Sequence, residues 1–416
     1  MPRRFKPLKT RHAAPRPVAF APVTATLKLL RELIALPSVN PAFTAPGHAD
    51  SGEARVADFL ASVAGCAGLD VELQKAAPGR FNLIARLAPK SKPRRRILLA
   101  PHMDTVPVAS NEQFTPRLKS GKLFGRGACD TKGSVAAMLT ALCEIAKSRS
   151  RPQETEIVFA GLVDEENAQL GSRALVRSSA FRRLGFTTHS PDRLKAGLQQ
   201  NLAIVGEPTG LKVVTAHKGS LWLELETRGR AAHGATPQFG RNAVHSMAHV
   251  VDLLQTDYAR GLLRRTHPLL GCATVSVGVI CGGSQPNIVP DRCKISVDRR
   301  TLPGESLASV RREITRLLRS KNLRAAIGET KIAPCDPMET DARLPLVREF
   351  LRAAGQARPL GVHFFCDAAV LSAAGIPSVV FGPGDIAQAH TADEWISVVQ
   401  LERAKNLLVH FLKSQP

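Results

Sequence analysis

Two histidines and several carboxylates stand directly after apolar stretches of this 416-residue chain. His102 and Asp104 follow the apolar run 97–100. An imidazole at such a position can bind a metal ion through one ring nitrogen, and a carboxylate two residues later can fix its tautomer by accepting the other N–H group. Taken alone, the pair is also consistent with a surface histidine beside an aspartate.

Further carboxylates occupy comparable positions. Asp164, Glu165 and Glu166 end the apolar run 155–163, and Glu207 ends the run 202–205. Three adjacent carboxylates repel one another, so they need either solvent, as in an exposed turn, or a cation.

Asp130 and His390 lie in glycine-containing loops. Glycines surround Asp130, which precedes an apolar helix pattern and could equally be an ordinary helix cap. His390 follows the sequence Gly382-Pro383-Gly384. Neither residue is informative by itself.

Taken together, these residues indicate a metal-dependent hydrolytic site more specifically than any one of them does alone. In open α/β sheets, ligands bind beyond the carboxyl ends of the strands. Zinc accepts histidine nitrogen and carboxylate oxygen, and paired metals roughly 3.5–4 Å apart act together on one substrate. A hydrolytic site also needs a carboxylate free of metal as the base, and Glu165 and Glu166 could divide these tasks.

The elements that must position these residues alternate between helix and strand. We expect helices from Thr24 to before Pro37, over 53–63 and from Gly133, with strands over 81–87, 97–100, 155–163 and 202–205. A helix near Pro345, a strand over 378–381 and a helix over 398–412 follow later. This alternation predicts an α/β fold with a mainly parallel central sheet.

The middle of the chain has a different pattern. Strands near 221–225, 273–280, 288–297 and 323–327 surround helices over 244–254 and 307–318. The order β-α-β-β-α-β is typical of a ferredoxin-like unit. We therefore predict a second domain over 211–328, inserted between catalytic segments 24–210 and 329–416.

Composition excludes several classes of protein. A hydrophobic content of 44% excludes a wholly disordered chain, and no uncharged apolar stretch approaches the about 18 residues of a membrane span. The net charge of +22 includes a basic segment, 1–23, that we expect to be a disordered tail. Aromatic residues form only 5% of the chain, so platforms for stacking nucleic-acid bases are scarce and nucleic-acid binding is not expected. The eight scattered cysteines contain no C-x-x-C pair and predict reduced thiols in the cytoplasm.

Six motifs together resemble a known enzyme family. They are His102-Met103-Asp104-Thr105-Val106-Pro107, Gly125 to Gly133 around Asp130, Asp164-Glu165-Glu166, Gly206-Glu207-Pro208-Thr209, Gly229 to Gly234 around His233, and His390 to Trp395. In order and spacing, the chain from about residue 25 is similar to the di-zinc amidohydrolases that include acetylornithine deacetylases, succinyl-diaminopimelate desuccinylases, aminoacylases and glutamate carboxypeptidases. The resemblance implies a zinc-peptidase-like catalytic domain and a dimerisation domain.

The same resemblance implies roles for individual residues. His102 and Glu207 would bind one zinc, Glu166 and His390 the other, and Asp130 would bridge both, with a cis peptide after it. Cobalt or manganese can replace zinc in such sites. Asp104 would orient His102, and Glu165 would be the catalytic base.

The inserted domain would contribute to the site of the other subunit of a homodimer. His233 would stabilise the oxyanion there, and Asn287 and Arg299 would bind the substrate carboxylate, although Arg300 is adjacent and could do so instead. Gly382 would line the pocket near His390. We expect hydrolysis of an N-acyl amino acid, as in acetylornithine deacetylases; a desuccinylase, a general aminoacylase or dipeptidase, and a non-catalytic binding protein remain alternatives.

Overall fold

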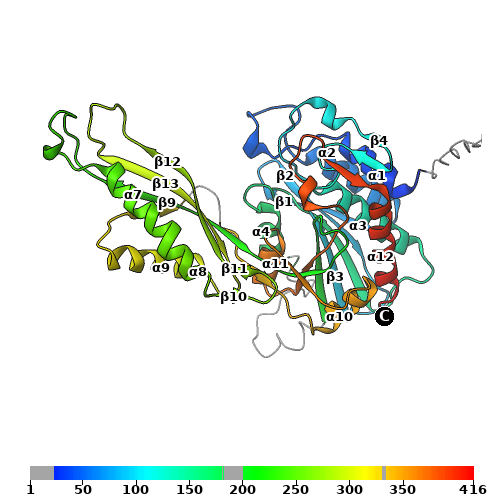
Figure 1. Cartoon of the computed structure of the whole chain (residues 1–416). Helices are drawn as coiled ribbons and strands as arrows, with labels where there is room; N and C mark the ends of the chain where they lie inside the picture. The colour runs from blue at the N-terminus through cyan, green and yellow to red at the C-terminus, as the bar shows by residue number, and fades with distance from the viewer. Residues whose placement is uncertain (1–22, 180, 182–199, 330–333) are drawn as a thin grey trace, which may run out of the picture.

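The chain forms a larger α/β body and an elongated second body that projects from it (Figure 1). The computed structural model describes residues 23–179, 181, 200–329 and 334–416. Apart from Val23, the predicted basic tail lies outside these residues. Among the described residues, no helix has the length and apolar character needed to span a membrane.

A nine-stranded sheet forms the centre of the larger body. Its order is β1-β2-β6-β3-β7-β17-β8-β15, with β16 also paired to β8. The central neighbours β6, β3, β7 and β17 run parallel, whereas the pairs toward both edges are antiparallel, except that β16 lies parallel to β8. The expected α/β fold with a mainly parallel central sheet is confirmed. The strands are β1 Asp70–Ala77, β2 Arg80–Leu87, β3 Arg95–Pro101, β6 Thr155–Gly161, β7 Asn201–Gly206, β8 Val214–His217, β15 Met338–Glu339, β16 Leu360–Val362 and β17 Ser378–Val380.

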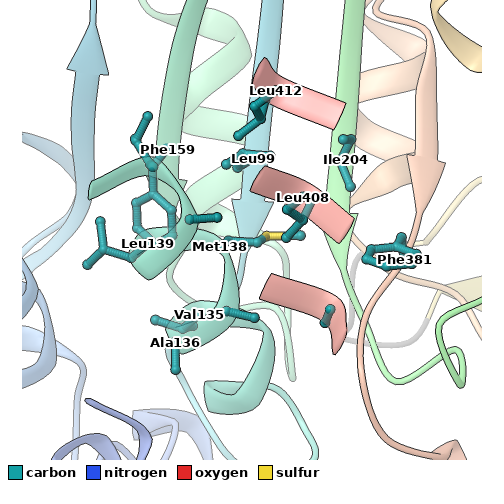
Figure 2. Packing of buried hydrophobic residues seen from close by; sticks show 14 of the residues in the cluster. Leu99, Val135, Ala136, Met138, Leu139, Phe159, Ile204, Phe381, Leu408 and Leu412 are labelled. Carbon is teal, nitrogen blue, oxygen red and sulfur yellow. The ribbon is translucent and has the colours of Figure 1, made fainter. Parts of the chain in front are cut away.

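Helices cover both faces of this sheet because its central strands are apolar on both sides. On one face, Leu99 and Ile204 pack against helices α3 and α12 (Figure 2). On the other, Leu98 and Ala203 pack against α4 and α11. The first face holds α1 Ala25–Ile34, α2 Ala54–Cys66, α3 Lys132–Lys147, α10 Pro345–Ala353 and α12 Val398–Lys413; the second holds α4 Leu170–Arg177 and α11 Ala368–Ala373.

The second body contains an antiparallel sheet of order β12-β13-β9-β14. Its elements follow the predicted β-α-β-β-α-β sequence, with the strand order of a ferredoxin-like fold. They are β9 Gly219–Arg228, α7 Ala243–Leu253, β12 Thr274–Gly282, β13 Arg292–Thr301, α9 Leu307–Ser320 and β14 Ala326–Glu329. Leu223 and Leu225 of β9 form a separate core with Val310 and Ile314 of α9.

The start of the second domain differs from the predicted residue 211. Strand β8 pairs with β17, β15 and β16, so it belongs to the larger sheet, and the chain changes sheets only at β9. All four residues of β8 are buried, as is typical of an interior strand, whereas β9 alternates between buried and more exposed residues. The predicted boundary missed this short strand because its four residues, Val-Thr-Ala-His, show no apolar–polar alternation.

Short elements complete the chain. Strand β18 joins β5 and β4 in a small sheet, which brings residues near 395 beside residues near 124. The remaining elements are η1 Pro41–Phe43, η2 Asn111–Phe114, β4 Arg117–Lys119, β5 Lys122–Phe124, η4 Pro237–Phe239, the π-helical turn η5 Leu254–Tyr258, α8 Ala259–Leu262, β10 Thr266–His267, β11 Gly271–Cys272, η6 Ile386–Gln388 and β18 Trp395–Ser397.

Candidate metal centre and active site

Most of the predicted site residues lie at one edge of the sheet, directly after three neighbouring strands. His102 follows β3, Glu165 and Glu166 follow β6, and Glu207 follows β7. Because β6, β3 and β7 are adjacent and parallel, their carboxyl ends meet at the same edge. Asp130, at the start of α3, approaches the same point.

The carboxylate of Asp130 lies between two histidines. Its Oδ1 is 3.1 Å from Nε2 of His102, and its Oδ2 is 3.3 Å from Nε2 of His390. Glu166 Oε2 lies 3.2 Å from the same His390 nitrogen, and Glu207 Oε1 lies 3.9 Å from Nε2 of His102. Each histidine is thus grouped with one further carboxylate, and Asp130 is common to both groups. The peptide bond after Asp130 is cis.

These residues fit a metal centre. Ligand atoms of His102, Asp130 and Glu166 all lie within 4.8 Å of one another. Glu166 Oε1 and Glu207 Oε1 are buried and accept no hydrogen bond from the described residues. Buried carboxylate oxygens without a partner are costly, and a cation would satisfy them.

The pKa values of the clustered acids and histidines indicate that the site lacks positive charge. Burial, together with the charge of Asp130, raises the pKa of Glu166 to about 7. Burial also raises the pKa values of Glu165 and Glu207 well above their usual range. Hydrogen bonds to Asp130 and Glu166 raise the pKa of His390 to about 10. Carboxylates that resist ionisation beside imidazoles that retain protons are expected where a bound cation normally supplies the charge.

The carboxylate of Asp104 positions the backbone segment that carries Glu165 and Glu166. Its Oδ1 and Oδ2 accept the backbone N–H groups of Glu165 and Glu166, each at 3.1 Å. Nδ1 of His102 lies 3.0 Å from the backbone carbonyl of Asp104 and 3.4 Å from its carboxylate. The shorter contact, which orients the imidazole, is therefore with the backbone, and the carboxylate mainly positions the acidic loop.

Asp104 is also held by a buried network of polar and charged side chains, which no sequence motif predicted. The side-chain amide of Asn40 donates to Asp104 at 2.7 Å and to Asp164 at 3.1 Å. Arg80 pairs with Asp164 at 2.6 Å and with the buried Glu53. The acid of the Asp164–Glu166 triplet that points away from the site is therefore neutralised by an arginine from β2.

Glu394 fixes the loop that presents Asp130. Its Oε1 accepts the backbone N–H groups of Cys129 at 2.7 Å and Asp130 at 2.9 Å. Its Oε2 accepts the N–H of Gly127 at 2.9 Å and the guanidinium of Arg126 at 2.8 Å. The side chain is 1% exposed, so one carboxylate organises four donors away from water.

Replacing Glu394 with glutamine is expected to destabilise the protein and weaken metal binding. The amide NH2 group would face two donors instead of accepting from them, and two buried donors without acceptors cost about 2–6 kcal/mol. Urea unfolding and metal content would measure both effects. Asp393→Asn is the matched control because it makes the same chemical change at the exposed neighbouring residue. Equal unfolding midpoints for the two variants would show that Glu394 does not hold the loop.

A comparison of the sequence with known families decides what kind of protein carries this site. A family model described as peptidase family M20/M25/M40 matches residues 98–414. The chain belongs to this family. Members of this family hydrolyse amide bonds, so the chain is an amide-bond hydrolase, as the sequence motifs predict.

Curated relatives of the M20 family cover nearly the whole chain. An acetylornithine deacetylase from Proteus mirabilis is 29% identical over 408 residues, which span 93% of this chain and 96% of the relative. An acetylornithine deacetylase from Myxococcus xanthus is 31% identical over 369 residues, which span 84% and 89%.

Solved structures share the fold. A tripeptidase from Staphylococcus aureus superposes with a TM-score of 0.71 at 20% identity and covers 94% of this chain and 97% of its own. An M20 family metallo-carboxypeptidase from Sulfolobus solfataricus gives 0.68 at 18% identity, with 94% and 99% covered. At these identities the likeness shows a shared fold.

His233 and Asn287, both predicted to act on the substrate, lie close together in the second body. The loop after β9, which carries His233, is at the end of the second domain remote from the larger body (Figure 1). Gly234 N–H donates to the carbonyl of Asn287 at 2.7 Å, and His233 forms a β-bridge with Ile288. His233 and Asn287 are both exposed, so the two loops present them on one surface.

The structure does not place Arg299 where a substrate could reach it. Its side chain is fully buried in the second domain, and its guanidinium pairs with Glu305 at 2.7 Å and donates to Tyr258 at 3.1 Å. The alternative, Arg300, has a side chain that is 29% exposed and pairs with Asp298. Alternation along β13 points neighbouring residues to opposite faces, and Arg299 falls on the inner one.

Gly382 is also buried and has no free donor. Its N–H donates to the hydroxyl of Thr209 at 3.1 Å, and its carbonyl accepts from Leu211 at 2.9 Å. A Cβ at this position would lie 2.4 Å from the carbonyl oxygen of Glu207. Gly382 thus allows close packing against the backbone of Glu207.

Proposed function

We propose that the protein is a metal-dependent deacylase that hydrolyses the amide of an N-acyl amino acid, with N-acetylornithine as the first candidate substrate. The observation that carries this proposal is the similarity to acetylornithine deacetylases, at 29% identity over 93% of the chain and 31% identity over 84% of it. The clustered His102, Asp130 and Glu166 support the metal-dependent chemistry.

In the proposed mechanism, the residues hold two divalent cations, with zinc as the first choice. His102 and Glu207 would bind one, Glu166 and His390 the other, and Asp130 both. Bound cations of this kind polarise a carbonyl and acidify water. Asp130 suits the shared position because each of its oxygens already faces a different histidine.

Glu165 is the proposed proton carrier. Its backbone is fixed by Asp104, and its buried carboxyl is not required by either metal-binding group. Burial raises its pKa, which suits a base that must accept a proton from water near neutral pH and then release it. Glu165 would pass that proton to the nitrogen of the departing amino acid.

We further propose a homodimer in which His233 of one subunit completes the site of the other. The loops after β9 and after β12, which carry His233 and Asn287, lie at the end of the second domain that is remote from the larger body (Figure 1). Strand β12 is an edge strand of its sheet, with Val279 58% and Ile280 57% exposed. An exposed apolar edge strand favours pairing with a second copy.

Placing lysine at both Val279 and Ile280 is therefore expected to yield monomers with little activity. Two charges on the edge strand would repel their counterparts in a symmetric pairing. Sedimentation velocity would measure the change. Val399→Lys is the control, since Val399 is 65% exposed on α12 of the larger body. A dimer that persists unchanged in the β12 variant would contradict the proposed interface.

A cytoplasmic location is proposed as well. All eight cysteines, including the buried Cys335 and Cys366, are free thiols. Reduced thiols are the usual state in the cytoplasm.

The substrate is tested by direct comparison of two acyl amino acids. Metal-loaded enzyme would be assayed with N-acetylornithine and with N-succinyl-diaminopimelate, beside a chelator-treated sample. Metal-dependent turnover of N-acetylornithine supports the proposal, whereas turnover of only the succinylated compound would replace it with a desuccinylase. No turnover of either would contradict both.

A further inference from the structure

A pocket of about 460 Å³ lies on the second domain, apart from the metal centre. It is formed where the end of β9, the end of α9 and the start of β14 meet. Four arginines line it: Arg228, Arg241, Arg319 and Arg324. Leu318 and Leu323 are among its apolar lining residues.

The positive charge of this pocket is not balanced by its own acids. Among the described residues, no carboxylate pairs with Arg241, Arg319 or Arg324. The one acidic lining residue, Glu226, already accepts from Arg292 at 2.5 Å and Arg228 at 2.8 Å, and Lys294 is 3.8 Å away. These bonds lower the pKa of Glu226, so its charge is present and already shared among three cations.

The walls of the pocket are defined by backbone hydrogen bonds. Arg230 and Arg241 exchange N–H···O bonds of 2.9 Å in both directions. Gly229 has no room for a side chain, because a Cβ there would lie 1.9 Å from the carbonyl oxygen of Arg241. On the other side, Ala326 of β14 pairs with Glu226 of β9. Arg241 therefore extends from a hydrogen-bonded backbone position.

This chemistry matches a small anion with more than one charged group. A guanidinium binds phosphate or carboxylate through two parallel hydrogen bonds, and several guanidiniums around one concave space favour a ligand with several such groups. Nucleic acid is less suited, because no aromatic side chain lines the pocket to stack a base.

The location leaves the pocket accessible in the proposed dimer. Strands β9 and β14 lie on the opposite side of the sheet from β12, which is the exposed edge strand. The lining residues include none of the metal-centre residues.

We propose that Arg228, Arg241, Arg319 and Arg324 form a binding site for a small polyvalent anion, either phosphorylated or polycarboxylic. The site is independent of the proposed substrate and of the metal centre. It belongs to the surface of the second domain, close to the loop that carries His233.

Calorimetric titration of the full-length, metal-free protein tests this proposal. Inorganic pyrophosphate and citrate serve as probes at constant ionic strength, and the absence of metal removes their chelating effect. The pocket variant is R319A/R324A. The control is R312A/R316A, which removes the same charge from exposed positions of α9 that do not line the pocket.

Binding of a probe should weaken about tenfold or more in the pocket variant, because each arginine removed takes away charge-assisted hydrogen bonds. The control should bind like the unaltered protein. Loss of pyrophosphate binding alone identifies a phosphate site, and loss of both identifies a general polyanion site. The proposal would be overturned if the unaltered protein bound neither probe, or if both variants lost affinity for a probe equally. It would also be overturned if a short oligonucleotide bound more tightly than the probes and both variants weakened that binding equally.

Discussion

Replacing Glu165 with glutamine is expected to abolish turnover while the protein retains its metal. Glutamine has the same shape, and the backbone N–H of residue 165 would still donate to Asp104. The variant lacks only the ability to accept and release a proton. General acid–base catalysis contributes about 10²–10⁴-fold, so kcat should fall by at least that factor.

Steady-state kinetics with metal analysis would separate this effect from damage to the site. Glu166→Gln is the informative companion, because Glu166 lies 3.2 Å from His390 and belongs to the metal-binding cluster. It should lose metal as well as turnover. The assignment would be wrong if Glu165→Gln turned over substrate at a near-normal rate.

A second large effect is expected for His233→Ala. If His233 stabilises the oxyanion in the partner's site, its removal should lower kcat by about 10²–10³-fold with little change in metal content. His249→Ala is the control, since His249 is an exposed histidine on α7 of the same domain.

Mixing the two inactive variants tests whether His233 acts between subunits. A heterodimer of Glu165→Gln and His233→Ala chains contains one site with both residues intact. Random exchange makes half of the dimers mixed, so about a quarter of the wild-type activity should return. Native mass spectrometry would confirm that heterodimers form. Mixed dimers without recovered activity would show that His233 does not serve the neighbouring site.

The sequence predicted that the candidate metal ligands lie close together, because several of them follow neighbouring strands. An apolar run that ends in an acid or histidine marks a strand end, and neighbouring parallel strands bring such ends together. His102, Glu166 and Glu207 were found in this way, and the structure groups them around Asp130.

Residues that act through long-range contacts were not predictable in the same way. Glu394 accepts bonds from residues more than 260 positions earlier, and this depends on β18 pairing with β5. Arg80 reaches Asp164 from the adjacent β2. Nothing in the local sequence of either residue indicates its partner.

The surroundings of two predicted substrate-binding residues, Arg299 and Gly382, depend on strand register and pairing that the sequence does not show. Arg299 and Arg300 are adjacent, and only the register of β13 determines that Arg299 is buried beside Tyr258. Gly382 was expected to face substrate, but the parallel pairing of β17 with β7 places the following loop against Glu207. The missed strand β8 has no periodicity that would distinguish it from a loop.

Hydrolysis by this protein is proposed to require two metal ions, held by His102, Asp130, Glu166, Glu207 and His390. The most direct test is to remove metal from the protein and restore zinc stepwise while following both zinc bound per chain and hydrolysis of N-acetylornithine. We expect activity to be absent without metal and to reach its maximum when two ions are bound per chain. Full activity in the metal-free protein, or binding of no more than one ion at this cluster, would contradict a two-metal site.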